Sequence, residues 1–129
     1  MSPAETALLR AMNGARAHAG LAPLRPDSRL EAAARAHSRE MLATNTFAHG
    51  AFASRMVRFD IRGVTAGENL AWGSGYRASA QSIVAAWLAS PEHRANLLRV
   101  SFKRVGVGSL DGAFQGANPA RVVTADFAG

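Results

Sequence analysis

The sequence contains no cysteine, and Lys103 is the only lysine among its fifteen basic residues. The absence of cysteine excludes disulfide bonds, thiolate zinc sites, iron–sulfur clusters and a cysteine nucleophile. Any metal chemistry therefore falls to His, Asp and Glu. The longest apolar run, 83–89, is too short to cross a bilayer, and the first residues lack the pattern of an export leader. Because removal of a signal peptide would leave the same chain, these absences assign no compartment.

Positive charge is plentiful but scattered. Fifteen Lys and Arg against nine Asp and Glu give a formal net charge of +6. Such a chain could be attracted to phosphate, anionic lipid or acidic polysaccharide, yet the sequence has no basic cluster interleaved with aromatic residues. We therefore rank arginine-mediated binding to nucleic acid or to an anionic surface last among the functions considered.

The chain is long enough for one hydrophobic core and too short for two. With 129 residues and 48% hydrophobic residues, it needs no metal or disulfide to fold. We expect a single domain over residues 1–129 and a monomer. No internal repeat, linker or low-complexity segment interrupts it.

Apolar spacing and capping signals predict the order of the elements. Ser2-Pro3-Ala4-Glu5 fits a capping box, and Asp27 or Ser28 can begin a second helix. The expected helices run over 2–20, 27–45, within 47–62, 78–89 and 90–98. A short strand is expected at 67–72, and two strands at 103–110 and 121–127 should pair antiparallel across a polar connection, 111–120. This order predicts an α+β layered domain with a small antiparallel sheet.

Several residues on these elements are expected to be structural. His37 lies on the apolar face of the second helix, where a lone histidine is usually hydrogen-bonded to the backbone. Trp87 lies on the apolar stripe of its helix and Phe127 on the last strand, so both are expected in the core and not in an aromatic ligand box.

Three polar residues stand in places that suggest a site. On a short strand, Glu68, Leu70 and Trp72 alternate with Asn69 and Ala71, so the Glu68 carboxylate faces the same way as two core-type side chains. A buried carboxylate needs a partner, which could equally be a structural arginine or a pair of histidines. His49 precedes a glycine that allows a sharp turn, and His93 lies in the first turn of a helix, where amide donors disfavour a charged ring.

Two imidazoles and one carboxylate can form the first shell of a divalent ion such as Zn²⁺ and leave positions for water. The separations of His49, Glu68 and His93 match no local ligand motif. With one formal negative charge and no thiolate, such a site should bind zinc weakly and reversibly, and the protein should stay folded without it. Binding should weaken as the pH falls through the histidine range, near 6.5 for an unshifted ring.

The sequence resembles the SCP-like bacterial branch of the CAP superfamily, which groups cysteine-rich secretory proteins, antigen 5 and pathogenesis-related proteins. Two blocks carry most of the resemblance, Gly67-Glu68-Asn69 and Ser90-Pro91-x-His93-Arg94-x-Asn96. The remaining matches are at 34–38, 47–49, 70–71, 87–89, 97–98 and 105–108. The resemblance implies a three-layer α-β-α sandwich, usually exported, with a central cleft whose His and Glu residues can bind a divalent cation.

The resemblance assigns the cleft residues one by one. His49 matches the first cleft histidine, Glu68 the glutamate of the Gly-Glu-Asn block, and His93 the second histidine. Eukaryotic relatives have a second glutamate where this sequence has Ser90. Glu92 could replace it, although an acid at a helix N-terminus has a simpler role in stabilising the helix dipole.

The leading hypothesis is an extracellular CAP-domain protein whose cleft binds a small molecule, a lipid, a cell-envelope component or a divalent metal, with no defined reaction. The alternative from the enzyme class is metal-assisted hydrolysis at His49, Glu68 and His93. That alternative lacks an evident general base, because Glu68 would be occupied as a ligand.

Overall fold

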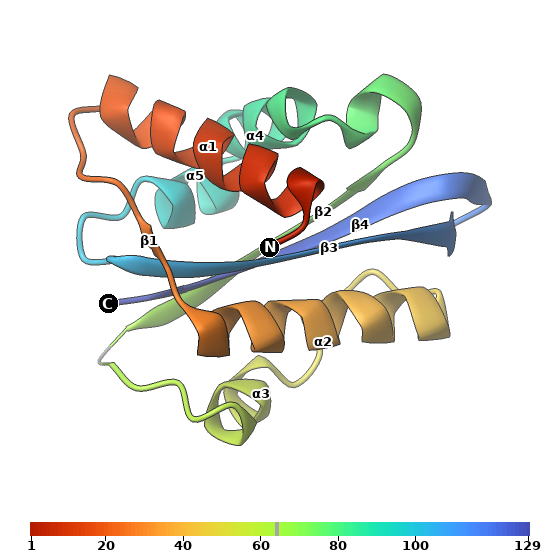
Figure 1. Ribbon diagram of the computed structural model, residues 1–129, viewed down its shortest axis with the longest axis horizontal. Helices are drawn as coiled ribbons and strands as arrows, with labels where there is room; N and C mark the ends of the chain where they lie inside the picture. Colours follow the sequence, from red (N-terminus) through yellow and green to blue (C-terminus); the bar gives the residue numbers. More distant parts are fainter. Residues whose placement is uncertain (64) are drawn as a thin grey trace.

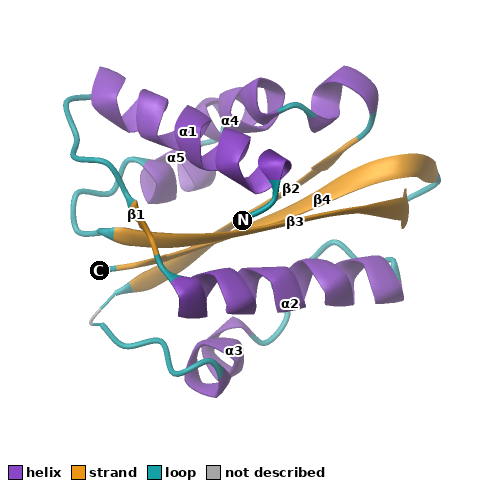
Figure 2. Cartoon of the chain, in the orientation of Figure 1, coloured by secondary structure: helices purple, strands orange, loops and turns teal. Residues whose placement is uncertain are grey.

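The computed structural model describes residues 1–63 and 65–129 and has three layers (Figure 1 and Figure 2). One face of a central sheet is covered by the helices α1 (Pro3–His18), α4 (Ala80–Ala89) and α5 (Pro91–Leu97). The other face is covered by α2 (Ser28–Thr44) and α3 (Phe52–Arg58). The predicted α-β-α sandwich is therefore confirmed. Within the described residues, no helix is both long and apolar enough to cross a membrane.

The sheet is mixed rather than wholly antiparallel. Its strands are β1 (Arg25–Pro26), β2 (Ala66–Gly73), β3 (Arg104–Phe114) and β4 (Ala117–Ala128), in the order β1-β3-β4-β2. The two-residue β1 pairs parallel with β3, in a segment where sequence analysis predicted no strand. All other pairs are antiparallel. β2 therefore lies at one edge of the sheet.

The terminal hairpin is longer than predicted. The polar segment 111–120 was expected to be a connection, but only Gln115 and Gly116 form the turn, both with positive φ (50° and 81°). Such a pair matches the right-handed twist of the two strands. Asp111 and Arg121 are opposite each other on the strands and form an ion pair, with Nε to Oδ1 at 2.8 Å. Polar residues here mark a solvent-exposed part of a strand, not a loop.

The helix starts follow the capping signals. The Ser2 hydroxyl accepts from Glu5 N–H, and the Glu5 carboxylate accepts from Ser2 N–H, so the capping box of α1 is confirmed. Asp27, not Ser28, caps α2 by accepting from two backbone N–H groups. Ser79 caps α4, which begins two residues later than expected because a short 3₁₀ helix, η1 (Gly75–Ala78), precedes it.

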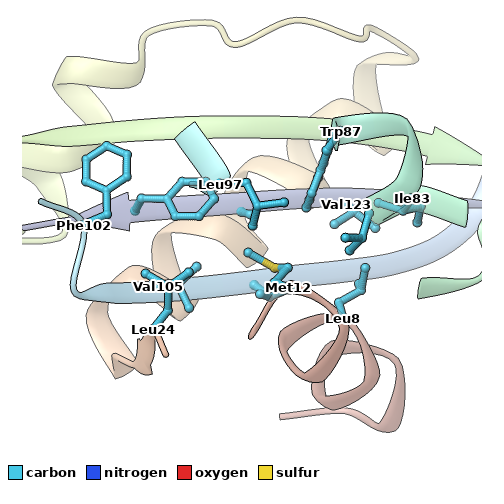
Figure 3. Close-up of a cluster of buried hydrophobic side chains, with 13 residues drawn as sticks. Leu8, Met12, Leu24, Ile83, Trp87, Leu97, Phe102, Val105 and Val123 are labelled. Carbon is cyan, nitrogen blue, oxygen red and sulfur yellow. The ribbon is translucent and has the colours of Figure 1, made fainter. Parts of the chain in front are cut away.

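The largest hydrophobic cluster lies between the sheet and the α1, α4 and α5 layer (Figure 3). Trp87 is 2% exposed and Phe127 is fully buried, so both predicted core residues are in the core. On the opposite face, α2 lies directly on β3. A Cβ at Gly106 would overlap the backbone of Leu30 and Glu31, so glycine there permits the close approach of helix and sheet.

A buried arginine joins the layers on the α1 side. Arg16 is 1% exposed, and its guanidinium donates hydrogen bonds to backbone carbonyls outside its own helix. The acceptors are Ala22, Leu97, Arg99 and Phe102. The connection from α5 to β3 is thereby held against α1, which fixes the position of α5 and of the histidine that it carries.

Candidate functional site

The three predicted site residues come from three different parts of the fold. His49 lies in the connection between α2 and α3, Glu68 on the edge strand β2, and His93 in the first turn of α5. The Glu68 side chain is 2% exposed, whereas the His49 side chain is 56% exposed. The site is thus built where both helical layers reach the same edge of the sheet.

Glu68 has two partners, an arginine, as one predicted alternative had it, and a single histidine, where the other alternative was a pair. His49 Nδ1 lies 2.8 Å from Glu68 Oε1, and Arg55 Nη2 donates to Glu68 Oε2. Arg55 comes from α3 and is itself buried. Both carboxylate oxygens are therefore engaged by side chains of this chain. Arg55 was not among the predicted site residues.

His37 supports this arrangement from behind. Its Nε2 lies 2.7 Å from the Ala48 carbonyl, which can only accept, so Nε2 carries the proton. Nδ1 then accepts from Arg55 Nη1 at 2.9 Å. Burial, and then the positive charge of Arg55, lowers the pKa of His37. His37 is a neutral, structural histidine, as predicted, and it positions both Arg55 and the loop that carries His49.

His93 is held in place by two neighbouring side chains, Ser90 and Asn69. Its Nδ1 lies 2.9 Å from the Ser90 hydroxyl, and its backbone carbonyl accepts from Asn69 Nδ2. Burial, and then the nearby His49, lowers the pKa of His93. A neutral ring is therefore favoured at His93. Glu92 is exposed, and its carboxylate has no hydrogen bond within residues 1–63 and 65–129.

A groove of about 310 Å³ opens beside His93. Its lining includes Phe47, Leu70, Trp72, Trp87, Ser90 and His93. Both histidines use Nδ1 for a protein contact, and neither Nε2 has a hydrogen-bond partner in the part of the chain that the structure describes. Across that same part, no three His, Asp or Glu side chains are grouped closely enough to hold a metal ion.

A larger groove lies away from these residues. It has a volume of about 550 Å³ and runs between α1 and the pair α4 and α5. Its lining is mostly alanine, valine and leucine, with His18 and Arg94 as its basic residues.

Asp126 is a buried acidic residue that sequence analysis did not single out. It lies on β4 opposite Glu68 of β2 and is fully buried. Neither of its carboxyl oxygens has a hydrogen-bond partner among the described residues, and Arg55 Nε is 4.0 Å from Oδ2. Burial, and then the neighbouring Glu68, raises the pKa of Asp126 well above its usual value of 3.8. One guanidinium thus faces two carboxyl groups, and a proton on Asp126 leaves a single ion pair between Arg55 and Glu68.

Replacing Asp126 by asparagine should raise the free energy of unfolding near neutral pH by about 1 to 3 kcal/mol, the equivalent of about one to two pKa units. A carboxyl group whose pKa is raised by folding stabilises the protein at pH values below its unfolded-state pKa. That contribution is lost as the pH rises through the folded-state pKa. Asparagine resembles the protonated acid and does not titrate. Urea unfolding should show that Asp126→Asn is more stable than the unchanged protein near neutral pH. This difference should shrink as the pH falls towards the usual pKa of aspartate.

Asp111→Asn is the matched control. In the unchanged protein, a hydrogen bond from Arg121 lowers the pKa of Asp111. The Asp111 carboxylate therefore stabilises the fold near neutral pH, and its replacement should bring no gain in stability there. A loss of stability in Asp126→Asn near neutral pH would mean that Asp126 is ionised and depends on Arg55 as its counter-ion.

Comparison with known proteins finds one family that matches most of the chain. The sequence model of CAP, the cysteine-rich secretory protein family, matches residues 9–127. The chain is 35% identical over 116 residues to the uncharacterized protein YkwD of Bacillus subtilis (strain 168). That match covers 86% of the chain and 44% of YkwD.

Solved structures share the fold. An extracellular protein containing an SCP domain from Bacillus anthracis str. Ames has a TM-score of 0.81 and 25% identity, covering 99% of this chain and 44% of that one. An outer surface protein from Borrelia burgdorferi has a TM-score of 0.79 and 22% identity, covering 93% of this chain and 87% of that one. The chain spans less than half the length of YkwD and of the Bacillus anthracis protein.

Proposed function

Because the chain belongs to the cysteine-rich secretory protein (CAP) family, we propose that it acts outside the cytoplasm as a binding domain, with a ligand held between His49 and His93. The extracellular location is supported by the similarity to the SCP-domain protein of Bacillus anthracis. The binding role is supported by one observation in particular. Two histidines at the same edge of the sheet are each fixed through Nδ1, and each leaves Nε2 without a protein partner in the described chain.

This arrangement fits a weakly held divalent ion such as Zn²⁺. Imidazole nitrogens are good zinc ligands, and a metal-binding histidine commonly gives its other ring nitrogen to a carboxylate or hydroxyl group. Glu68 and Ser90 have that relation to His49 and His93. Since both Glu68 oxygens are already engaged, we propose that Glu68 orients His49 and does not bind the ion directly. Bound zinc would supply a Lewis acid at this edge of the sheet.

Calorimetric titration of zinc into chelator-treated protein tests this function. We expect weak, reversible binding, a protein that stays folded in chelator, and affinity reduced about tenfold or more in His49→Ala and in His93→Ala. The lowered pKa of His93 keeps that ring available for binding as the pH falls below the usual histidine value.

His18→Ala is the control, because His18 is exposed on α1 and lines only the larger groove. Its zinc affinity should equal that of the unchanged protein. Unaltered zinc binding in both cleft variants would reject the site, and unfolding in chelator would mean that the metal is structural.

A lipid or other apolar ligand would fit a different place. The groove of about 550 Å³ between α1, α4 and α5 is mostly apolar and has Arg94 on its lining, which suits an apolar chain with an anionic group. We therefore propose separate places for a metal ion and for an apolar ligand. The zinc titration tests only the metal site.

The hydrolase alternative and the anionic-surface alternative have less support. Hydrolysis needs a base close to the bound water, and the buried carboxylate nearest His49 has both oxygens engaged. Several arginines are paired with acidic side chains, which leaves less unpaired charge for an anionic surface. These pairs involve Arg29, Arg35, Arg55, Arg104 and Arg121.

A further inference from the structure

The edge strand β2 presents backbone groups that point away from the sheet. β2 is hydrogen-bonded to β4 on one side only. Beyond the end of the pair, Gly129 N–H donates to the Thr65 carbonyl. Because an antiparallel strand alternates the direction of its backbone groups residue by residue, the odd-numbered residues of β2 face β4. The N–H and C=O groups of Glu68, Leu70 and Trp72 therefore face outward.

Only some of these outward groups have partners. Asn96 Nδ2 donates to the Glu68 carbonyl at 3.1 Å, and Trp87 Nε1 donates to the Leu70 carbonyl at 3.0 Å. The Leu70 N–H, the Trp72 N–H and the Trp72 carbonyl have no hydrogen-bond partner within residues 1–63 and 65–129. Unpaired groups on a sheet edge are a ready template for another strand.

A continuous groove follows this part of the edge. The groove of about 310 Å³ beside His93 adjoins a second one of about 390 Å³, and the two share Ala71, Trp72 and Ala86. The second groove extends to Tyr76 on η1. Its aromatic side chains are exposed, with Trp72 at 38% and Tyr76 at 77%. The unpaired backbone groups thus open onto a channel that ends at His93.

We propose that this groove binds an extended peptide, which adds to β2 as a further strand. Trp72 offers one donor and one acceptor, so it can exchange two backbone hydrogen bonds with a single residue of an antiparallel peptide. Leu70 N–H offers a further donor to a peptide carbonyl. Alternate peptide side chains would lie against the exposed rings and against Ala86 of α4. The carboxyl end of an antiparallel peptide would then reach His93.

Peptide binding of this kind requires backbone contacts and no metal, so it is independent of the zinc proposal. The probes are capped pentapeptides with valine, phenylalanine, aspartate or lysine at the centre, titrated to millimolar concentration in chelator. Amide proton and nitrogen shifts of the labelled protein report the contact. We expect at least one probe to shift the Leu70 and Trp72 amides and to slow their hydrogen exchange.

A pair of N-methylated peptides and a pair of protein variants test whether the peptide lies along β2 as an added strand. N-methylation that removes N–H groups on one edge of the peptide should abolish binding, and methylation on the other edge should not. Ala86→Trp, at an exposed position that lines both grooves, should weaken peptide binding about tenfold or more. Ala89→Trp, an exposed position of the same helix, should bind the peptide normally.

Two results would overturn the proposal. One is that no pentapeptide shifts the two amides at millimolar concentration, and the other is that both N-methylated analogues bind equally well. If no peptide binds and a tetrasaccharide of N-acetylglucosamine perturbs the Trp72 ring, the groove is a glycan site instead.

Discussion

Replacing Arg55 by methionine should lower the free energy of unfolding by about 3 to 5 kcal/mol, because it leaves Glu68 as a buried charge without a cation. The Arg55 side chain is 5% exposed and the Glu68 side chain 2%. The same guanidinium donates to His37 Nδ1 and to the His49 carbonyl. Methionine fills a similar volume but replaces none of these donors. The loop that carries His49 should also lose part of its support, so zinc affinity should fall together with stability.

The test is a double-mutant cycle measured by urea unfolding. Glu68→Gln removes the charge that Arg55 neutralises, so the variant that carries both changes should be more stable than the sum of the two single losses predicts. Arg58→Met is the matched control, since Arg58 lies on the same helix, is exposed, and stacks on the Phe59 ring. If Arg55→Met costs no more than Arg58→Met, then the buried ion pair does not stabilise the fold.

Arg55 had a signal in the sequence that spacing alone could have revealed. Phe52, Met56 and Phe59 predicted a short helix, and a residue three positions after Phe52 lies on the same face as that apolar stripe. A charged residue on an apolar face needs a buried partner, just as Glu68 does on its strand. Sequence analysis predicted a partner for Glu68 but made no such prediction for Arg55, and no local pattern could connect two elements that meet only in the folded chain.

The order of the elements could be predicted because local rules determine it. Capping residues set the start of α1, and Pro91 separates α4 from α5. The length of the hairpin could not be predicted in the same way. Glycine, asparagine and proline in 111–120 are typical of a loop, yet cross-strand pairing of Asp111 with Arg121 keeps that segment in the sheet. Long-range pairing overrides the local preference there.

Asp126 could not be identified as unusual from its strand alone. On β4, Val122, Thr124 and Asp126 share one face, while Val123 and Phe127 share the other. Because Phe127 was expected in the core, a strand buried on one face only would have placed Asp126 on the solvent-exposed face. The sandwich covers both, since helices lie on each side of the sheet (Figure 1), and the carboxyl group is buried as a result. The burial of Asp126 is therefore a property of the layers and not of the strand.

The second large effect is expected at Trp87, whose replacement by alanine should lower the free energy of unfolding by about 3 to 5 kcal/mol. The indole packs with Ile83, Leu97 and Val123 in the cluster of Figure 3, and its Nε1 is 3.0 Å from the Leu70 carbonyl. Alanine removes the packing and also leaves that carbonyl without its donor. Trp87 lines the groove beside His93 as well, so its loss should widen the groove at the edge of β2.

Trp87→Phe separates the two contributions. Phenylalanine keeps most of the apolar contact and removes only the hydrogen bond, so it should cost about 1 to 3 kcal/mol, less than alanine does. Urea unfolding measures both losses, and calorimetry with zinc measures binding in the same proteins at a temperature where they stay folded. Because the indole N–H donates to the Leu70 carbonyl and to neither histidine, zinc affinity in Trp87→Phe should be unchanged. A Trp87→Ala protein with full stability and no zinc binding would show instead that Trp87 is a ligand-binding residue, and the aromatic wall of the groove would then be part of the site and not of the core.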